Sequence, residues 1–357
     1  MERRTFLTAL SSGAALAAVA EAHRAGQTAK DKAASGEAGR RLRFSREGKF
    51  KILAVTDLHF GPEQDPYAVS LISEMIAAEK PDLVLCNGDN IMGGDSRTIA
   101  EVKDAVDQVA RAMEKAGVPW AVVLGNHDRE HNAHTGLADD AFFALFEAYP
   151  HNLNAGWNRA ITGTGNHHML VWDAEGNKPL ANIWQLDSGK GSKDETLSYE
   201  WVHQDQIAWY HTTQAELEKR YGYLPALMFF HIPVREFIDL AASKKIEGAR
   251  GEDEAPSGIN SGLFAAVLER KDVMGMFCGH DHENNYIGEY RGVTLGFIGV
   301  TGVLNAYPHI AETDARNARL RGGRVFELYA DKPGQFKSWV RLRDGSINWE
   351  HWNTKRA

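Results

Sequence analysis

Short apolar runs and helical patterns alternate along the first part of the chain. Residues 50–56, 83–86 and 120–124 are almost continuously apolar, which is typical of strands buried on both faces. Between these runs, apolar residues recur on one helix face over residues 67–79 and 99–113. This order predicts an α/β fold in which parallel strands are joined by right-handed helical crossovers.

The second part of the chain is richer in strand-like runs. They cover residues 168–172, 182–186, 224–230, 273–278, 293–298, 324–329 and 336–342. Two further patterns, over residues 204–220 and 260–269, predict helices. Several of the runs are joined by short turns that contain glycine, which predicts a second, mixed sheet.

The N-terminal residues have a different composition. Arg3 and Arg4 precede a weakly apolar stretch at residues 9–20, and Ala20-Glu21-Ala22 forms a small-x-small cleavage pattern. Residues 1–22 therefore resemble a twin-arginine signal peptide, which predicts export to the periplasm or the medium; the alternative is an arginine pair before an ordinary helix. Residues 23–44 are predicted to be a flexible linker and 45–352 the catalytic domain. No run is long and apolar enough for a stable membrane span.

Composition narrows the classes of partner. The formal net charge of the 357 residues is -8, so we expect no binding of nucleic acid, which favours basic surfaces. The only two cysteines, Cys86 and Cys278, each lie close before a candidate ligand. They are interpreted as small buried side chains, and a disulfide between them is the open alternative.

Five short motifs along the chain are rich in residue types that bind metals, and each directly follows a predicted strand. They are Asp57-Leu58-His59, Gly88-Asp89-Asn90, Gly125-Asn126-His127-Asp128, His231 and Gly279-His280-Asp281-His282. Strand ends can bring such residues together although they are far apart in the sequence. A mixture of Asp, His and Asn without a thiolate suits iron, manganese or zinc. Any one of these motifs alone would be weak evidence for a metal site, because a single histidine such as His231 more often has a structural role.

The ordered set, over roughly residues 50–310, resembles the calcineurin-like metallophosphoesterase superfamily. Residues 88–91, 184–189, 230–233 and 260–262 are similar to its purple-acid-phosphatase-like branch of the plant and fungal type. The resemblance implies a four-layer α/β/β/α sandwich of two mixed sheets flanked by helices. It also implies two divalent or mixed-valence metal ions (Fe, Mn or Zn) at the strand ends.

The same resemblance implies a role for each motif residue. One ion would be held by Asp57, His59 and His282, the other by Asn126, His231 and His280, and Asp89 would bridge them. His127 would face the substrate and Asp128 would orient it. True purple acid phosphatases have a tyrosine three residues after the bridging aspartate, where this chain has Met92, so we expect no purple tyrosinate absorption.

The expected reaction is hydrolysis of a phosphate monoester by attack of a metal-bound hydroxide, on a small phosphorylated molecule or a phosphoprotein. A phosphodiesterase would use the same ligands and is the first alternative. A non-catalytic metal-binding scaffold is the second, although no ligand of the set is missing. The tryptophan-rich segment 157–209 is either core packing or an aromatic wall of the site, and the polar segment 248–258 is either a solvated loop or a lid.

Overall fold

The computed structural model describes residues 41–194, 196–303 and 321–353. The predicted signal peptide and the predicted linker up to residue 40 lie outside the described residues. Leu42–Arg43 form strand β1, which pairs with β5 (His167–Trp172), and Leu42 and Phe44 are buried. The predicted linker, residues 23–44, therefore extends too far towards the C-terminus. The folded domain begins near Leu42, because the side chains of Leu42 and Phe44 are part of its core.

The strands predicted in the first part of the chain form half of a six-stranded sheet. Its strands are β14 (Ile347–Asn353), β13 (Phe336–Leu342), β12 (Gly322–Tyr329), β2 (Lys49–Val55), β3 (Leu83–Asn87) and β4 (Trp120–Val123), in that spatial order. The last three are parallel, and β12 is antiparallel to β2. The predicted parallel unit is thus confirmed. The edge strand β14 was not predicted, because most of its residues are exposed or half-buried and it has no apolar run.

The second sheet has eight strands and is mixed, as predicted. In spatial order they are β1, β5, β6 (Pro179–Gln185), β7 (Ala226–Phe229), β9 (Val273–Cys278), β11 (Val293–Phe297), β10 (Ile287–Tyr290) and β8 (Ile246–Glu247). The central strands β6, β7, β9 and β11 are parallel to one another. Their carboxyl ends therefore lie along one edge, which is where the fourth and fifth motifs begin.

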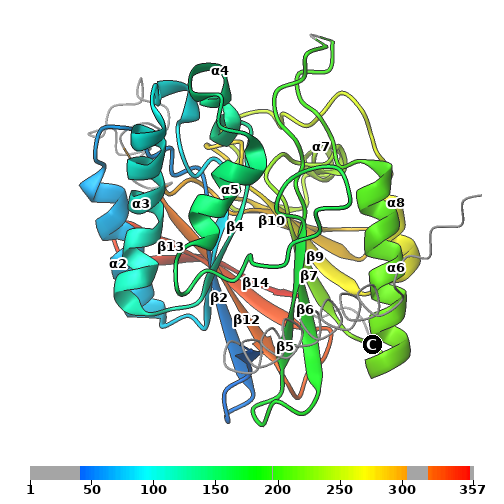
Figure 1. The fold of residues 1–357 in the computed structure, drawn as a ribbon. Helices are drawn as coiled ribbons and strands as arrows, with labels where there is room; N and C mark the ends of the chain where they lie inside the picture. The colour runs from blue at the N-terminus through cyan, green and yellow to red at the C-terminus, as the bar shows by residue number, and fades with distance from the viewer. Residues whose placement is uncertain (1–40, 195, 304–320, 354–357) are drawn as a thin grey trace, which may run out of the picture. The chain divides into compact units, whose positions relative to one another are not determined.

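Helices cover the outer faces of both sheets, with α2, α3 and α5 on one side and α6, α7 and α8 on the other (Figure 1). Their bounds are α2 (Pro66–Glu79), α3 (Ile99–Ala116), α4 (Asn132–Thr135), α5 (Asp139–Glu147), α6 (Gln204–Tyr221), α7 (Glu236–Ala242) and α8 (Leu263–Arg270), with 3-10 turns η1 (Gly93–Asp95) and η2 (His127–Arg129). The predicted four-layer sandwich is confirmed. Among the described residues, no helix combines the length and the apolar composition that crossing a bilayer requires.

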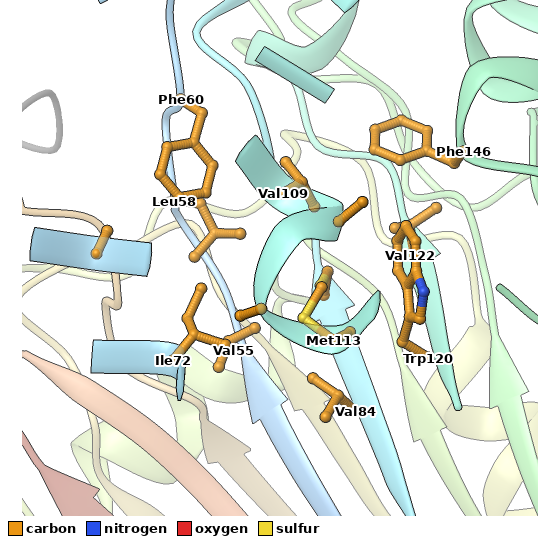
Figure 2. Close-up of a cluster of buried hydrophobic side chains, with 14 of the residues drawn as sticks. Val55, Leu58, Phe60, Ile72, Val84, Val109, Met113, Trp120, Val122 and Phe146 are labelled. Atoms are coloured by element: carbon orange, nitrogen blue, oxygen red, sulfur yellow. The ribbon is translucent and has the colours of Figure 1, made fainter. Parts of the chain in front are cut away.

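Three apolar clusters fill the spaces between the four layers. On β2, Leu53 and Val55 point towards α2 and α3, whereas Ile52 and Ala54 point towards the other sheet. Figure 2 shows the cluster beneath α2 and α3, where Val55 lies beside residues from both helices. Burial on both faces explains why the strand reads as a continuous apolar run. Strands packed this tightly give the loops at their ends a rigid base.

Candidate metal centre

The five motifs meet at the carboxyl ends of strands from both sheets. Asp57, Asp89 and Asn126 follow β2, β3 and β4 of the six-stranded sheet, while His231 follows β7 and His280 follows β9 of the other. The backbone connects neighbouring motifs directly. The N–H of Asp57 donates to the carbonyl of Gly88 at 3.0 Å, and the N–H of His59 donates to that of Asp89 at 2.9 Å. The structure therefore brings together the residues that the sequence placed at strand ends.

Four of these residues have an unusual backbone conformation. Asp57, His59, Asp89 and His280 have φ values of 53°, 49°, 47° and 77°, in the left-handed region that residues other than glycine rarely adopt. Each such conformation costs about 1–3 kcal/mol and persists only where the surrounding structure imposes it, most often at functional sites. Here it turns successive side chains at the strand ends towards one point.

Glycines before two of the ligands allow the close approach of other side chains. A Cβ atom on Gly88 would lie 2.3 Å from Nδ1 of His231. A Cβ atom on Gly125 would lie 2.2 Å from Oδ1 of Asp89. Any side chain at either position would displace a candidate ligand. The glycines of the second and third motifs are therefore needed for space inside the centre.

The first group of candidate ligands consists of Asp57, His59, Asp89 and His282, all buried. The Nε2 atoms of His59 and His282 are 3.1 Å apart. Nε2 of His282 lies 3.2 Å from Oδ1 of Asp57, and Nε2 of His59 lies 3.8 Å from Oδ2 of Asp89. Two imidazoles and two carboxylates thus direct ligand atoms into one small space, as a metal ion requires.

The second group consists of Asp89, His231 and His280, also buried. Nε2 of His231 lies 3.1 Å from Oδ2 of Asp89, and the rings of His231 and His280 are 5.3 Å apart between centroids. Within each group, the ligand atoms all lie within 4.8 Å of one another. Because Asp89 belongs to both groups, the arrangement is that of two ion sites that share one carboxylate.

Asn126, expected as a further ligand, follows β4 beside the second group. Its Oδ1 atom is buried and has no hydrogen-bond partner among the described residues. The next backbone N–H, that of His127, donates to Oδ1 of Asp89 at 2.9 Å, which holds this loop against the shared carboxylate. A buried acceptor without a donor is costly unless a cation or water satisfies it. The donor set and this acceptor fit a pair of metal ions.

Burial and charge set the protonation of the histidines. Burial lowers the pKa of His59 and of His280 to about 3, so both imidazoles are neutral, the form that binds metals. Burial also opposes a charge on His231, but the carboxylates of Asp89 and Asp57 outweigh it and raise the pKa to about 10. The field that holds a proton on His231 is the field that would attract a cation, so protons and metal ions compete for this site.

Neighbouring polar groups orient the candidate ligands. Nδ1 of His231 lies 2.9 Å from the carbonyl oxygen of Asn87, which leaves Nε2 towards Asp89. The Thr56 hydroxyl donates to Oδ2 of Asp57 at 2.9 Å. Such contacts set the tautomer and direction of metal ligands in proteins. The ligand geometry is therefore built into the fold.

His127 lies at the edge of the centre. Its side chain is 35% exposed, whereas that of His59 is 1% exposed, and the two rings are 5.2 Å apart in an edge-on arrangement. Nδ1 of His127 lies 2.9 Å from Oε1 of Glu130. A histidine that is reachable from solvent and adjacent to a ligand can contact a substrate. The expectation that His127 faces the substrate stays a prediction.

The partner expected for His127 was wrong. Asp128 does not orient it: the Asp128 carboxylate accepts hydrogen bonds from the N–H groups of Gly125 at 2.8 Å and Ile91 at 2.9 Å, and from Nδ2 of Asn90 at 3.0 Å. Asp128 instead fastens the loop after β4 to the loop after β3. Adjacent side chains on a helical turn point apart, whereas residues three apart share a side. The i, i+3 spacing was the signal for Glu130 that sequence reasoning missed.

A buried ion-pair network beside the centre was also missed. The guanidinium of Arg129 contacts the carboxylate of Asp187, lies 3.3 Å from Oδ2 of Asp139, and donates to the carbonyl of Gly189 at 3.2 Å. Asp187 also accepts from the N–H of Thr164 at 2.6 Å. Arg129 therefore joins the loop after β4, which carries His127, to the loop after β6.

Two open interpretations are now decided. Trp157 and Trp184 are buried in separate apolar clusters, so core packing is confirmed for them. Cys86 and Cys278 are free and buried, also in separate clusters, so they form no disulfide.

The polar segment 248–258 is bound to the last motif, since the N–H of Ala255 donates to Asp281 at 3.3 Å. It borders the centre; the lid interpretation stays a hypothesis.

Comparison with known proteins adds independent support. The family model described as calcineurin-like phosphoesterase matches residues 50–284. "Probable inactive purple acid phosphatase 29" of Arabidopsis thaliana is 32% identical, covering 87% of this chain and 86% of its own. "Probable inactive purple acid phosphatase 14" of the same plant is 31% identical, covering 85% and 83%. A dimetal phosphatase from Danio rerio superimposes with a TM-score of 0.56 at 14% identity over 86% of this chain and 99% of that one, which shows a shared fold.

Proposed function

The chain belongs to the calcineurin-like phosphoesterase family and is a hydrolase of phosphoric ester bonds, and on this premise we propose that it hydrolyses a phosphate monoester at a centre of two metal ions. The main support for the proposal is that the buried carboxylate of Asp89 belongs to both groups of candidate ligands. A carboxylate shared in this way is what two neighbouring ions need between them.

Each residue has a proposed task. Asp57, His59 and His282 would hold one ion, Asn126, His231 and His280 would hold the other, and Asp89 would serve both. Two ions bound by these residues would supply Lewis acidity, which lowers the pKa of water and offsets negative charge on a phosphate ester. His127 donates a hydrogen bond to a phosphoryl oxygen or a proton to the leaving oxygen, because it lies beside the centre and remains accessible.

The preference for a monoester is supported by the relatives, which are named as purple acid phosphatases, although both names also contain the word inactive. A diesterase would use the same ligands. The decisive experiment compares the hydrolysis of p-nitrophenyl phosphate with that of bis-p-nitrophenyl phosphate after loading with manganese, iron or zinc, with a chelator as control. Faster turnover of the monoester, lost with the chelator, is expected.

The other outcomes have distinct meanings. Faster turnover of the diester would make the protein a phosphodiesterase. Two bound ions per chain without turnover of either compound would favour the metal-binding scaffold, in keeping with the names of the plant relatives. Loading with iron also tests the metal: the residue at the tyrosine position is Met92, so no intense visible tyrosinate band is expected.

We further propose that residues 1–22 direct export as a twin-arginine signal. The test is N-terminal sequencing of the protein recovered outside the cytoplasm of a bacterial host. A mature chain that starts at His23 is expected. Changing Arg3 and Arg4 together to Lys should keep the protein inside the cell; export of this variant at the normal level would contradict the proposal.

A further inference from the structure

Tyr199 lies directly against the second group of candidate ligands. Its ring meets the imidazole of His280 edge-on, with 4.5 Å between centroids and 90° between planes. It belongs to the aromatic-rich segment 157–209, but unlike Trp157 and Trp184 it is only half-buried and lies outside the apolar clusters of the described residues. Core packing therefore does not account for it.

The loop that carries Tyr199 is tied down on both sides. The hydroxyl of Ser257 donates to the carbonyl of Tyr199 at 2.9 Å, and the N–H of Tyr199 donates to the carbonyl of Leu197 at 2.7 Å. Ser198, immediately before it, has a φ of 60°, and its carbonyl accepts from the N–H of Ser192 at 2.9 Å. A residue held in a conformation that costs energy is held there by its surroundings.

The hydroxyl of Tyr199 is a hydrogen-bond donor without a partner among the described residues. An ordinary phenol carries its proton at neutral pH, so this hydroxyl can donate. Because the ring lies against His280, the side chain borders the second group of candidate ligands.

We propose that Tyr199 is a substrate-binding residue whose phenolic O–H donates to an oxygen of the phosphoryl group. This inference rests on the proposed function. His127 lies against His59 of the first group, and Tyr199 lies against His280 of the second, so the two donors flank the centre from its two ion sites. A phosphate ester carries negative oxygens that need donors, and the carboxylates around the centre supply none.

The test uses Tyr199→Phe, which removes the hydroxyl but keeps the ring against His280. Tyr223→Phe, at a tyrosine that is 51% exposed, is the matched control. The dissociation constant of inorganic phosphate is measured by calorimetry on the metal-loaded proteins, beside metal content, kcat and KM for p-nitrophenyl phosphate. The expected result for Tyr199→Phe is phosphate binding weakened about tenfold and unchanged metal content, because a hydrogen bond to a charged group is lost. The control should match the wild type.

Three results would overturn the inference. Phosphate affinity equal to that of the wild type would show that the hydroxyl does not contact the phosphoryl group. Loss of metal from Tyr199→Phe would show that Tyr199 supports the ions. A visible tyrosinate band in the iron-loaded wild type that disappears in Tyr199→Phe would make Tyr199 a ligand. Absence of turnover in the wild type would contradict the proposed function. The dissociation constant of inorganic phosphate would still decide the role of Tyr199.

Discussion

Nδ1 of His127 lies 2.9 Å from Oε1 of Glu130, one helical turn further along the chain. Burial opposes a charge on this imidazole, but the contact with Glu130 and the charge of Asp89 raise the pKa of His127 to about 9. The carboxylate of Glu130 therefore favours the protonated form of the ring. Glu130, and not Asp128, is the carboxylate that pairs with His127.

Replacing Glu130 by Gln should lower kcat for p-nitrophenyl phosphate by about tenfold, because the charge that favours protonated His127 is lost while the side-chain shape is kept. Metal content should stay at the wild-type level, since Glu130 is in neither ligand group. Glu147→Gln, which removes a surface pair with Arg159, is the control and should leave kcat unchanged. Loss of metal from Glu130→Gln would show that the role given to Glu130 is wrong.

Replacing Asp89 by Asn should abolish the pairing of the ions. The amide is neutral and cannot serve two cations, so the metal content is expected to fall from two ions per chain to one or fewer, and turnover should disappear. Elemental analysis after gel filtration measures the first quantity and the p-nitrophenyl phosphate assay the second. A variant that retains two ions would refute the bridging role.

Replacing Gly125 by Ala tests the space inside the centre. The new Cβ atom would lie 2.2 Å from Oδ1 of Asp89 and 2.8 Å from Cδ2 of His231, so the backbone or the ligands must move. We expect the free energy of unfolding to fall by about 1–3 kcal/mol and metal content to fall with it. Gly191→Ala is the matched control, because a Cβ atom there meets nothing within 4 Å. Equal stability of the two variants would contradict this account.

Asp272 should make stability depend on pH. It is buried, and burial raises its pKa to about 6 although the hydroxyl of Tyr210 donates to it at 2.5 Å. The folded state then keeps a proton that the unfolded state releases near pH 3.8, the ordinary pKa of the residue. This stabilisation is therefore fully present below pH 3.8 and is lost as the pH rises through about 6.

Raising the pKa of Asp272 from 3.8 to about 6 contributes at most about 3 kcal/mol to the free energy of unfolding at low pH. Asp272→Asn keeps the acceptor for Tyr210 and removes the titration. The free energy of unfolding of the wild type minus that of the variant should therefore decrease between about pH 4 and pH 7 in urea denaturation. A difference that does not change over this range would show that Asp272 has an ordinary pKa in the folded protein.

The sequence by itself determined where the strands buried on both faces lie. It also determined that the motifs follow the carboxyl ends of these strands. The run over β2 is apolar because Ile52 faces the other sheet and Leu53 faces the helices, so the pattern reports burial directly. Since parallel strands end along one edge, Asp57 and Asp89 had to lie near each other. The strand β14 escaped prediction because an exposed edge leaves no such pattern.

Only the tertiary structure decided which other side chains contact the histidines of the motifs. Asp128 and Glu130 follow His127 in the same turn, and the direction of each Cβ decides that Asp128 points to the backbone while Glu130 meets the imidazole. Tyr199 reaches His280 across 81 positions of the chain, through a loop whose path depends on Ser257. Spacing along a strand or helix records local direction and burial, whereas contacts between distant loops depend on how whole elements pack, and a single sequence leaves no periodic trace of that packing.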